Sequence, residues 1–291
     1  MNPAPNLAVL ALLAGAICIA LSPIFVRVSE AGPTATAFWR VAIAVPVLWV
    51  LYFRSRKTTR RYAGKWPLLL AAGFAFAGDL AFWHSSIQLT SVANSTLLAN
   101  LASIFVTLAA WMFLGQRPSV LFLAGLGAAL VGIALLVHTS LEFSSTGLIG
   151  DALGVVTAIF YAGYILAVKG LRDRGETTLH LMATTSTITA LFLFPVALAS
   201  GEQMLPVSAF GWWMLAGLAL VSHAAGQGLI AYALASLPAA FSSVSLLFQP
   251  VMAALFAWAL LSESLVPLQV LGGLVVLVGI HLARRGSSAG Q

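Results

Sequence analysis

The residues of this chain that could do chemistry are few, and they lie inside long apolar stretches. Asp79, Trp83 and Ser86 are spaced by four and three residues, which places them on one face of a helix. His223 and Gln227 follow the first two at a constant distance of 144 residues. Polar groups are costly in hydrocarbon, so both faces should line a protein interior, and an intramembrane carboxylate is by default a functional candidate.

Helical spacing adds polar stripes in two further stretches and an aromatic group in a third: Thr96, Asn100, Ser103 and Thr107; Ser242, Ser245 and Gln249; and Phe160, Tyr161 and Tyr164. From all these stretches we predict one substrate-binding cavity, lined by Asp79, Trp83, Asn100, Tyr161, Tyr164, His223, Gln227 and Gln249. Neutral amides would bind a carboxylate less tightly than a guanidinium fork does. The rings would hold an apolar side chain or attract an ammonium group.

Each of these side chains also has a purely structural interpretation. Ser and Thr in membrane helices often bond to their own backbone, and amides can link neighbouring helices. Aromatic rings pack in the core or anchor at the membrane interface. Arg40 stands a turn or so inside its apolar stretch, so snorkelling to the headgroups is the favoured expectation. Its pairing with Glu30 or with a substrate carboxylate is the alternative.

Catalytic and cofactor chemistry find little support in the sequence. Asp79 is the one aspartate deep inside a predicted span, since Asp151 falls at the outer end of its span, so a pair of catalytic carboxylates is missing. The single Cys18 cannot form an internal disulfide, and the five His residues fall in five different stretches or stretch ends, so we expect no metal site. No phosphate-binding loop of the Walker type is present. We therefore expect no cofactor and no enzymatic activity.

The composition of the chain is typical of an integral membrane protein. The hydrophobic fraction is 60%, the charged fraction is 8% and the mean hydropathy is +1.00, whereas a soluble domain has about 25% charged residues. About 20 apolar residues cross a bilayer as a helix. We predict an all-α integral membrane protein with ten transmembrane helices at 6–26, 35–53, 66–86, 92–113, 119–138, 149–169, 178–199, 211–232, 239–261 and 266–284.

The second half of the sequence repeats part of the first. Gly125 and Gly132 match Gly272 and Gly279 at an offset of 147 residues, and Trp111 matches Trp258 at the same offset. We therefore predict two five-helix repeats, residues 1–145 and 146–291, within one integrated domain. Because five is odd, the second repeat must be inverted, and inverted repeats are typical of transporters with a site between the halves.

The basic residues indicate the orientation of these helices. Of the fourteen Lys and Arg residues, twelve fall at one side of the predicted bundle, and six of them lie in the loop that follows the second helix. Cytoplasmic loops collect Lys and Arg, so both termini should be cytoplasmic. The net charge of +6 is thus a topology signal, and no nucleic-acid partner is expected.

The chain also resembles a known family. Gln249-Pro250, the Leu261-Ser262-Glu263 turn and the Leu271–Gly279 run are similar to those of the drug/metabolite transporter superfamily, and of its EamA-type exporters in particular. The first half departs from the pattern, because Gln116 stands where the family's repeat often has Glu. Within the family, the length and the aromatic-rich helices most resemble the YddG-type amino-acid exporters.

The resemblance implies a secondary-active or facilitative exporter of small metabolites, above all aromatic and apolar amino acids, that works by alternating access. Few ionisable groups lie in the predicted spans, which favours facilitated export or weak proton dependence. The expected partners are a small-molecule substrate and the lipid bilayer of a bacterial inner membrane, and a monomer is compatible with the sequence. The alternatives are an intramembrane enzyme and a channel or lipid-handling scaffold, although the rings of charge typical of a channel are missing.

Overall fold

The computed structural model describes residues 3–55, 65–90, 92–138, 147–262 and 265–288, and every regular element in these ranges is a helix. The helices are α1 (Pro5–Ala20), α2 (Ser22–Arg27), α3 (Pro33–Ala42), α4 (Ala44–Arg54), α5 (Lys65–Leu89), α6 (Val92–Ala99), α7 (Ala102–Leu114), α8 (Val120–Val137), α9 (Leu148–Asp173), α10 (Thr178–Ala199), α11 (Ala209–Gly217), the π-helix η3 (Leu218–Gln227), α12 (Gly228–Ala233), α13 (Ala239–Ser245), α14 (Phe248–Leu261) and α15 (Pro267–Ser288).

Within the described ranges these helices form ten segments long and apolar enough to cross a membrane, at 5–27, 33–54, 65–87, 94–113, 120–137, 148–173, 178–199, 209–233, 239–260 and 267–287. The predicted all-α membrane fold is confirmed, with bounds that differ by a few residues. Several residues used to orient the bundle lie outside the described ranges: Arg56, Lys57, Arg60, Arg61, Glu142 and Glu263.

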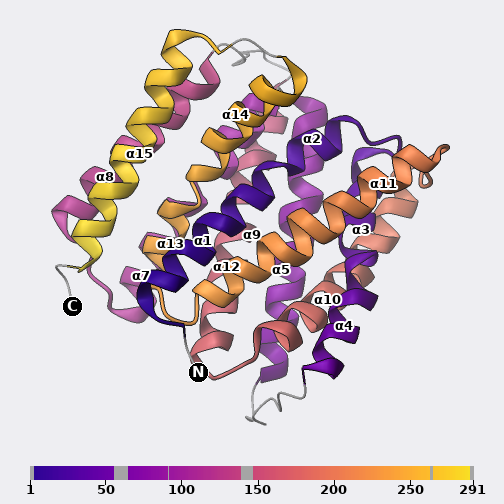
Figure 1. Ribbon diagram of the computed structural model, residues 1–291, viewed down its shortest axis with the longest axis horizontal. Coiled ribbons are helices and arrows are strands. Elements are labelled where there is room, and N and C mark those ends of the chain that lie inside the picture. The colour runs from indigo at the N-terminus through magenta and orange to yellow at the C-terminus, as the bar shows by residue number, and fades with distance from the viewer. Residues whose placement is uncertain (1–2, 56–64, 91, 139–146, 263–264, 289–291) are drawn as a thin grey trace.

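The helices cross as a tilted bundle with both chain ends on one side, which we call the termini side (Figure 1). The end of α4 and the start of α5 also lie there. α8 and α15 pair along one flank, while α3, α4, α10 and α11 lie on the opposite flank (Figure 1). α5 packs along α9 through the middle. Helices satisfy their backbone hydrogen bonds internally, as the hydrocarbon core demands.

The repeated glycines form the contact between α8 and α15. A Cβ added at Gly125 would lie 2.6 Å from the Gly279 carbonyl oxygen, and one at Gly132 would lie 2.7 Å from the Gly272 oxygen. The sequence offset of 147 residues converts one of these pairs into the other. Backbone therefore packs against backbone between α8 and α15, as small residues on facing membrane helices allow.

Four of the ten spans are interrupted within the described ranges, and three of these breaks lie just before a proline. The breaks at Leu21, Ile43 and Leu246–Leu247 precede Pro23, Pro46 and Pro250, because proline cannot donate the hydrogen bond that would continue the helix. Pro195, by contrast, lies within α10, which stays unbroken although proline commonly interrupts a helix. The break at residues 100–101 contains no proline.

That proline-free break is held by side chains. The Asn100 amide donates to the Thr96 carbonyl at 2.7 Å, and the Ser103 hydroxyl donates to the Asn100 carbonyl at 2.9 Å. Such local bonds compete with the helical ladder. At the repeat offset of 147 residues, residues 100–101 correspond to Leu247 and to residue 248, so the break recurs at the Leu246–Leu247 junction. Discontinuous helices at matching positions of two halves are typical of transporter binding sites.

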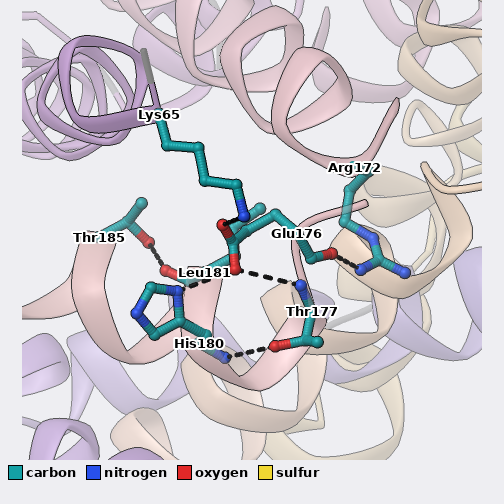
Figure 2. A network of polar contacts seen from close by, with 7 residues as sticks. All are labelled: Lys65, Arg172, Glu176, Thr177, His180, Leu181 and Thr185. Carbon is teal, nitrogen blue, oxygen red and sulfur yellow. Dashed lines mark hydrogen bonds and ion pairs between the residues drawn. The ribbon is translucent and has the colours of Figure 1, made fainter. Parts of the chain in front are cut away.

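A buried acidic residue ties together three helices on the termini side (Figure 2). Glu176, in the turn between α9 and α10, lies 2.7 Å from Lys65 Nζ at the start of α5, and the two side chains are 0% and 8% exposed. The His180 ring donates to the same carboxylate at 2.8 Å, and Arg172 donates to the Glu176 carbonyl. The network fixes α5 against α9, the two helices that carry Asp79 and Tyr161.

We expect Glu176→Gln to destabilise the protein, because it leaves the buried Lys65 ammonium opposite a neutral group. Breaking a buried ion pair costs about 3 kcal/mol, which should appear as a lower melting temperature in detergent. Burial raises the pKa of Glu176, but hydrogen bonds from His180 and Lys65 outweigh it and hold the pKa below its ordinary 4.5. The contribution is therefore present above pH 4.5 and lost as the pH falls through the lowered pKa.

Asp173→Asn is the matched control, because its exposed pair with Lys169 in the same region is solvated and worth little. Equal melting temperatures for Glu176→Gln and Asp173→Asn at neutral pH would contradict the stabilising role of the network.

Two carboxylates on the side opposite the termini join the first and second halves of the chain. Glu30 accepts hydrogen bonds from the N–H groups of Val207 and Ser208 before α11, and Glu202 accepts from the Thr34 N–H at 2.7 Å at the start of α3. The hydroxyl and the N–H of Ser208 lower the pKa of Glu30. Each carboxylate caps a helix of the other half, where the helix dipole favours negative charge.

Candidate functional site

A cavity of about 160 Å³ lies where seven of the ten spans meet. Its described lining residues are Ile19, Ala20, Ser22, Pro23, Arg40, Phe76, Asp79, Leu80, Trp83, Thr96, Ala99, Asn100, Thr157, Tyr161, Gln227, Gln249, Pro250 and Ala253. Pockets for drug-sized ligands have roughly 300–1,000 Å³. This space is smaller, so it suits a small metabolite.

Six of the eight residues predicted for a binding site line this cavity: Asp79, Trp83, Asn100, Tyr161, Gln227 and Gln249. Asp79 and Trp83 occupy one face of α5, as their spacing predicted, and Trp83 also meets the His84 ring edge to face at 4.9 Å between centroids. The third member of the predicted face, Ser86, turns elsewhere and donates to the Gly150 carbonyl at 2.7 Å.

A group of amide and phenol side chains forms part of the wall. Gln227 at the end of η3, Gln249 near the start of α14 and Tyr161 of α9 meet at this wall. Gln227 Oε1 and Gln249 Nε2 are buried and have no hydrogen-bond partner among the described residues. One acceptor and one donor are thus left available at this wall, and buried polar groups without partners are costly.

The remaining two predicted residues, Tyr164 and His223, lie behind the wall. The His223 Nε2 atom lies 2.7 Å from the Ser186 hydroxyl, and the ring stacks on Phe76 at 5.4 Å. Tyr164 is 3% exposed and packs on Phe76 and Tyr161 at 4.7 and 6.1 Å. The rings therefore support cavity residues, and the structure does not place them in the lining.

Arg40 departs from the favoured expectation. Its side chain is 6% exposed and lines the cavity, so snorkelling to the headgroups is wrong. The pairing with Glu30 is also absent, because Glu30 binds Val207 and Ser208. One terminal nitrogen of Arg40 donates to the Ser22 hydroxyl at 3.1 Å, and this contact with α2 holds the guanidinium inside the protein.

Most of the predicted Ser and Thr stripes bond to their own helices. Ser103, Thr107, Ser242 and Ser245 each donate to a carbonyl three or four residues earlier. The helices that carry these residues nevertheless line two further cavities. A cavity of about 30 Å³ shares Asn100, Tyr161 and Gln249 with the main one, and a cavity of about 510 Å³ lies toward the termini side, beside the turn at residues 115–119.

These three cavities follow the interface between α6–α7 and α13–α14. From the main cavity toward the termini side, the first pair contributes Asn100, Ser103 and Thr107 in turn. The second pair contributes Gln249 and then residues of α13. The helices with matching breaks therefore border a discontinuous path along the bundle.

Other lining residues were harder to identify from the sequence. Ser22 and Thr157 carry small hydroxyls that are common in membrane helices, and Phe76 belongs to an apolar run. Phe76 lies seven residues before Trp83, so helical periodicity alone could have placed it on the same face. Among the described residues, no group of three His, Cys, Asp or Glu side chains is arranged to hold a metal ion.

Comparison with known proteins gives consistent results. The EamA-like transporter family matches the chain twice, over residues 6–138 and 148–285. The chain is 28% identical to an uncharacterized transporter of Archaeoglobus fulgidus, over 89% of this chain and 91% of the relative. It is 26% identical to the pseudopaline exporter CntI of Pseudomonas aeruginosa, over 88% and 89% of the two chains.

One further relative and one solved structure are also similar to this chain. A protein of Streptantibioticus cattleyicolor named "Probable terminal-alkyne amino-acid exporter" is 29% identical over 66% of this chain and 64% of its own. A solved crystal structure superposes with a TM-score of 0.82 over 96% of this chain and 98% of the other, at 16% identity, which supports the fold. Since the family matches nearly the whole described bundle, this chain belongs to the EamA-like transporter family.

Proposed function

We propose that this transporter exports amino acids or closely related small metabolites, with a preference for aromatic and apolar side chains. The observation that carries the proposal is the mixed lining of the main cavity. Trp83, Phe76 and Ile19 offer apolar surface, while Gln227, Gln249 and Asn100 offer amides. A substrate with one apolar end and one polar end matches such a lining.

The relatives support this substrate class. Two of them are named as exporters, one of pseudopaline and one of an amino acid with a terminal alkyne. The names describe those proteins, which are 26–29% identical to this chain, and they favour a small substrate related to amino acids here. The family likewise argues for transport rather than catalysis.

We further propose alternating access between two inverted repeats, residues 1–145 and 146–291, with both termini in the cytoplasm. The glycine pairs that interchange under one sequence offset, the matching breaks near residues 100 and 247 and the double family match support the repeat. The chain of cavities along α6–α7 and α13–α14 supports a path that opens to one side at a time.

A flux assay tests the proposed substrate class. The purified protein is reconstituted in liposomes preloaded with one unlabelled amino acid, and the uptake of labelled amino acids, a sugar and a nucleoside is compared. We expect exchange of phenylalanine, tryptophan and leucine above that of protein-free liposomes, and no exchange of the sugar or the nucleoside. Preloading should accelerate uptake, because a carrier returns faster when loaded.

Other outcomes would favour the alternatives. Uptake that preloading does not change would indicate a channel, and recovery of a chemically altered solute would indicate an enzyme. Exchange confined to solutes other than amino acids, at equal amounts of reconstituted protein, would contradict the proposed substrate class.

A further inference from the structure

Two side chains of opposite charge line the main cavity without forming a direct ion pair. Arg40 comes from α3 and Asp79 from α5, and each lies within electrostatic influence of the other. Among the described residues, the ion pairs of 4 Å or less join other side chains, and none joins these two. A cation and an anion thus face one small space from two helices.

The Arg40 guanidinium is buried with part of its hydrogen-bonding capacity unused. It is 6% exposed, its contact with Ser22 engages one terminal nitrogen, and its Nε atom has no partner. A guanidinium carries five donors in a planar fork that suits a carboxylate. A buried charge with so few partners is costly, and a ligand carboxylate would offset this cost.

The Asp79 carboxylate also lacks hydrogen-bond partners among the residues that the structure describes. No hydrogen bond to its carboxylate is found within the described part of the chain, although it lies in the middle of α5 and faces the cavity. A carboxylate in this position accepts hydrogen bonds from an ammonium group. Neither Lys nor His lines the cavity among the described residues, so the protein itself supplies no ammonium or imidazolium beside Asp79.

We propose that Arg40 and Asp79 together recognise the zwitterionic head of the substrate, with Arg40 on the carboxylate and Asp79 on the ammonium. This inference rests on the proposed function and specifies its chemistry. It also revises the expectation of a site made of neutral donors alone, because the carboxylate gains a charged partner. The apolar side chain of the substrate would then lie against Trp83 and Phe76.

Ligand analogues test the proposal on the unmodified protein. Phenylalaninamide lacks the carboxylate charge, and 3-phenylpropanoate lacks the ammonium. Their ability to inhibit uptake of labelled phenylalanine in liposomes is compared with that of unlabelled phenylalanine, and thermal stabilisation in detergent measures binding separately. Because hydrogen bonds to charged groups are the strong ones, we expect each analogue to need at least about tenfold higher concentration than phenylalanine.

Variants then assign each charge to one end of the substrate. Arg40→Gln should remove the advantage of phenylalanine over phenylalaninamide, and Asp79→Asn should remove its advantage over 3-phenylpropanoate. Each variant should leave the other discrimination in place. Arg40→Lys should keep part of the first, because it retains the charge but loses the fork. Arg54→Gln, at an exposed site at the end of α4, is the control.

The results separate this proposal from the broader one. Exchange of amino acids that is inhibited equally by all three ligands would overturn the role of Arg40 and Asp79 and leave the proposed function standing. If folded Arg40→Gln and Asp79→Asn still prefer phenylalanine over both analogues as the unmodified protein does, the role of the two residues is likewise overturned. If no amino acid is exchanged and none stabilises the protein, both the proposed function and this inference are overturned.

Discussion

Gly132→Ala should strongly destabilise the bundle, although alanine is the better helix former. A Cβ at this position would lie 2.6 Å from the Val276 nitrogen and 2.7 Å from the Gly272 oxygen, both of which are backbone atoms. Backbone cannot move aside as a flexible side chain can, so α8 and α15 must separate. Overpacking of this kind costs about 1–3 kcal/mol, and Gly132→Leu should prevent recovery of monodisperse protein in detergent.

Gly127 provides a matched control on the same helix. No atom lies within 4 Å of a Cβ added there, so Gly127→Ala meets open space. It should be neutral or stabilising by about 0.5–1 kcal/mol, since alanine loses less backbone entropy than glycine in a helix. Melting curves of the two variants measure the contrast directly. A Gly132→Ala protein as stable as Gly127→Ala would mean that α8 and α15 do not approach at this point.

The features best predicted from the sequence depend on composition and on spacing along single helices. The ten spans follow from runs of apolar residues, and the face that joins Asp79 to Trp83 follows from the helical period. The close packing at Gly125, Gly132, Gly272 and Gly279 follows in the same way, because small residues at matching positions indicate close helix contacts.

Features that depend on a neighbouring helix were harder to predict. Arg40 points inward because the Ser22 hydroxyl, 18 residues away, accepts its hydrogen bond, and hydropathy contains no information on that contact. His223 was matched to Asp79 at an offset of 144 residues, but it belongs to the π-helix η3. Gln227 reaches the cavity, whereas His223, four residues earlier, packs on Ser186 and Phe76, and these contacts with neighbouring helices are not contained in the sequence offset.

The Trp83→Ala variant should change which substrates are exported more than it changes folding. Trp83 lines the main cavity from α5 and offers the largest ring there, so its removal withdraws apolar surface from the substrate side chain. At about 25 cal/mol per Å² of apolar surface, the loss of some 60 Å² of ligand contact lowers affinity roughly tenfold. Exchange of phenylalanine at low concentration should fall accordingly.

Exchange of alanine should fall much less in Trp83→Ala, because the alanine methyl group reaches little of the ring. The ratio of phenylalanine to alanine exchange is therefore the informative quantity, and it is independent of the amount of folded protein. Trp258→Ala is the control, since Trp258 is 55% exposed on α14 and is absent from the lining. An unchanged ratio in Trp83→Ala would place the substrate side chain away from Trp83, toward Phe76 or the small cavity beyond Tyr161.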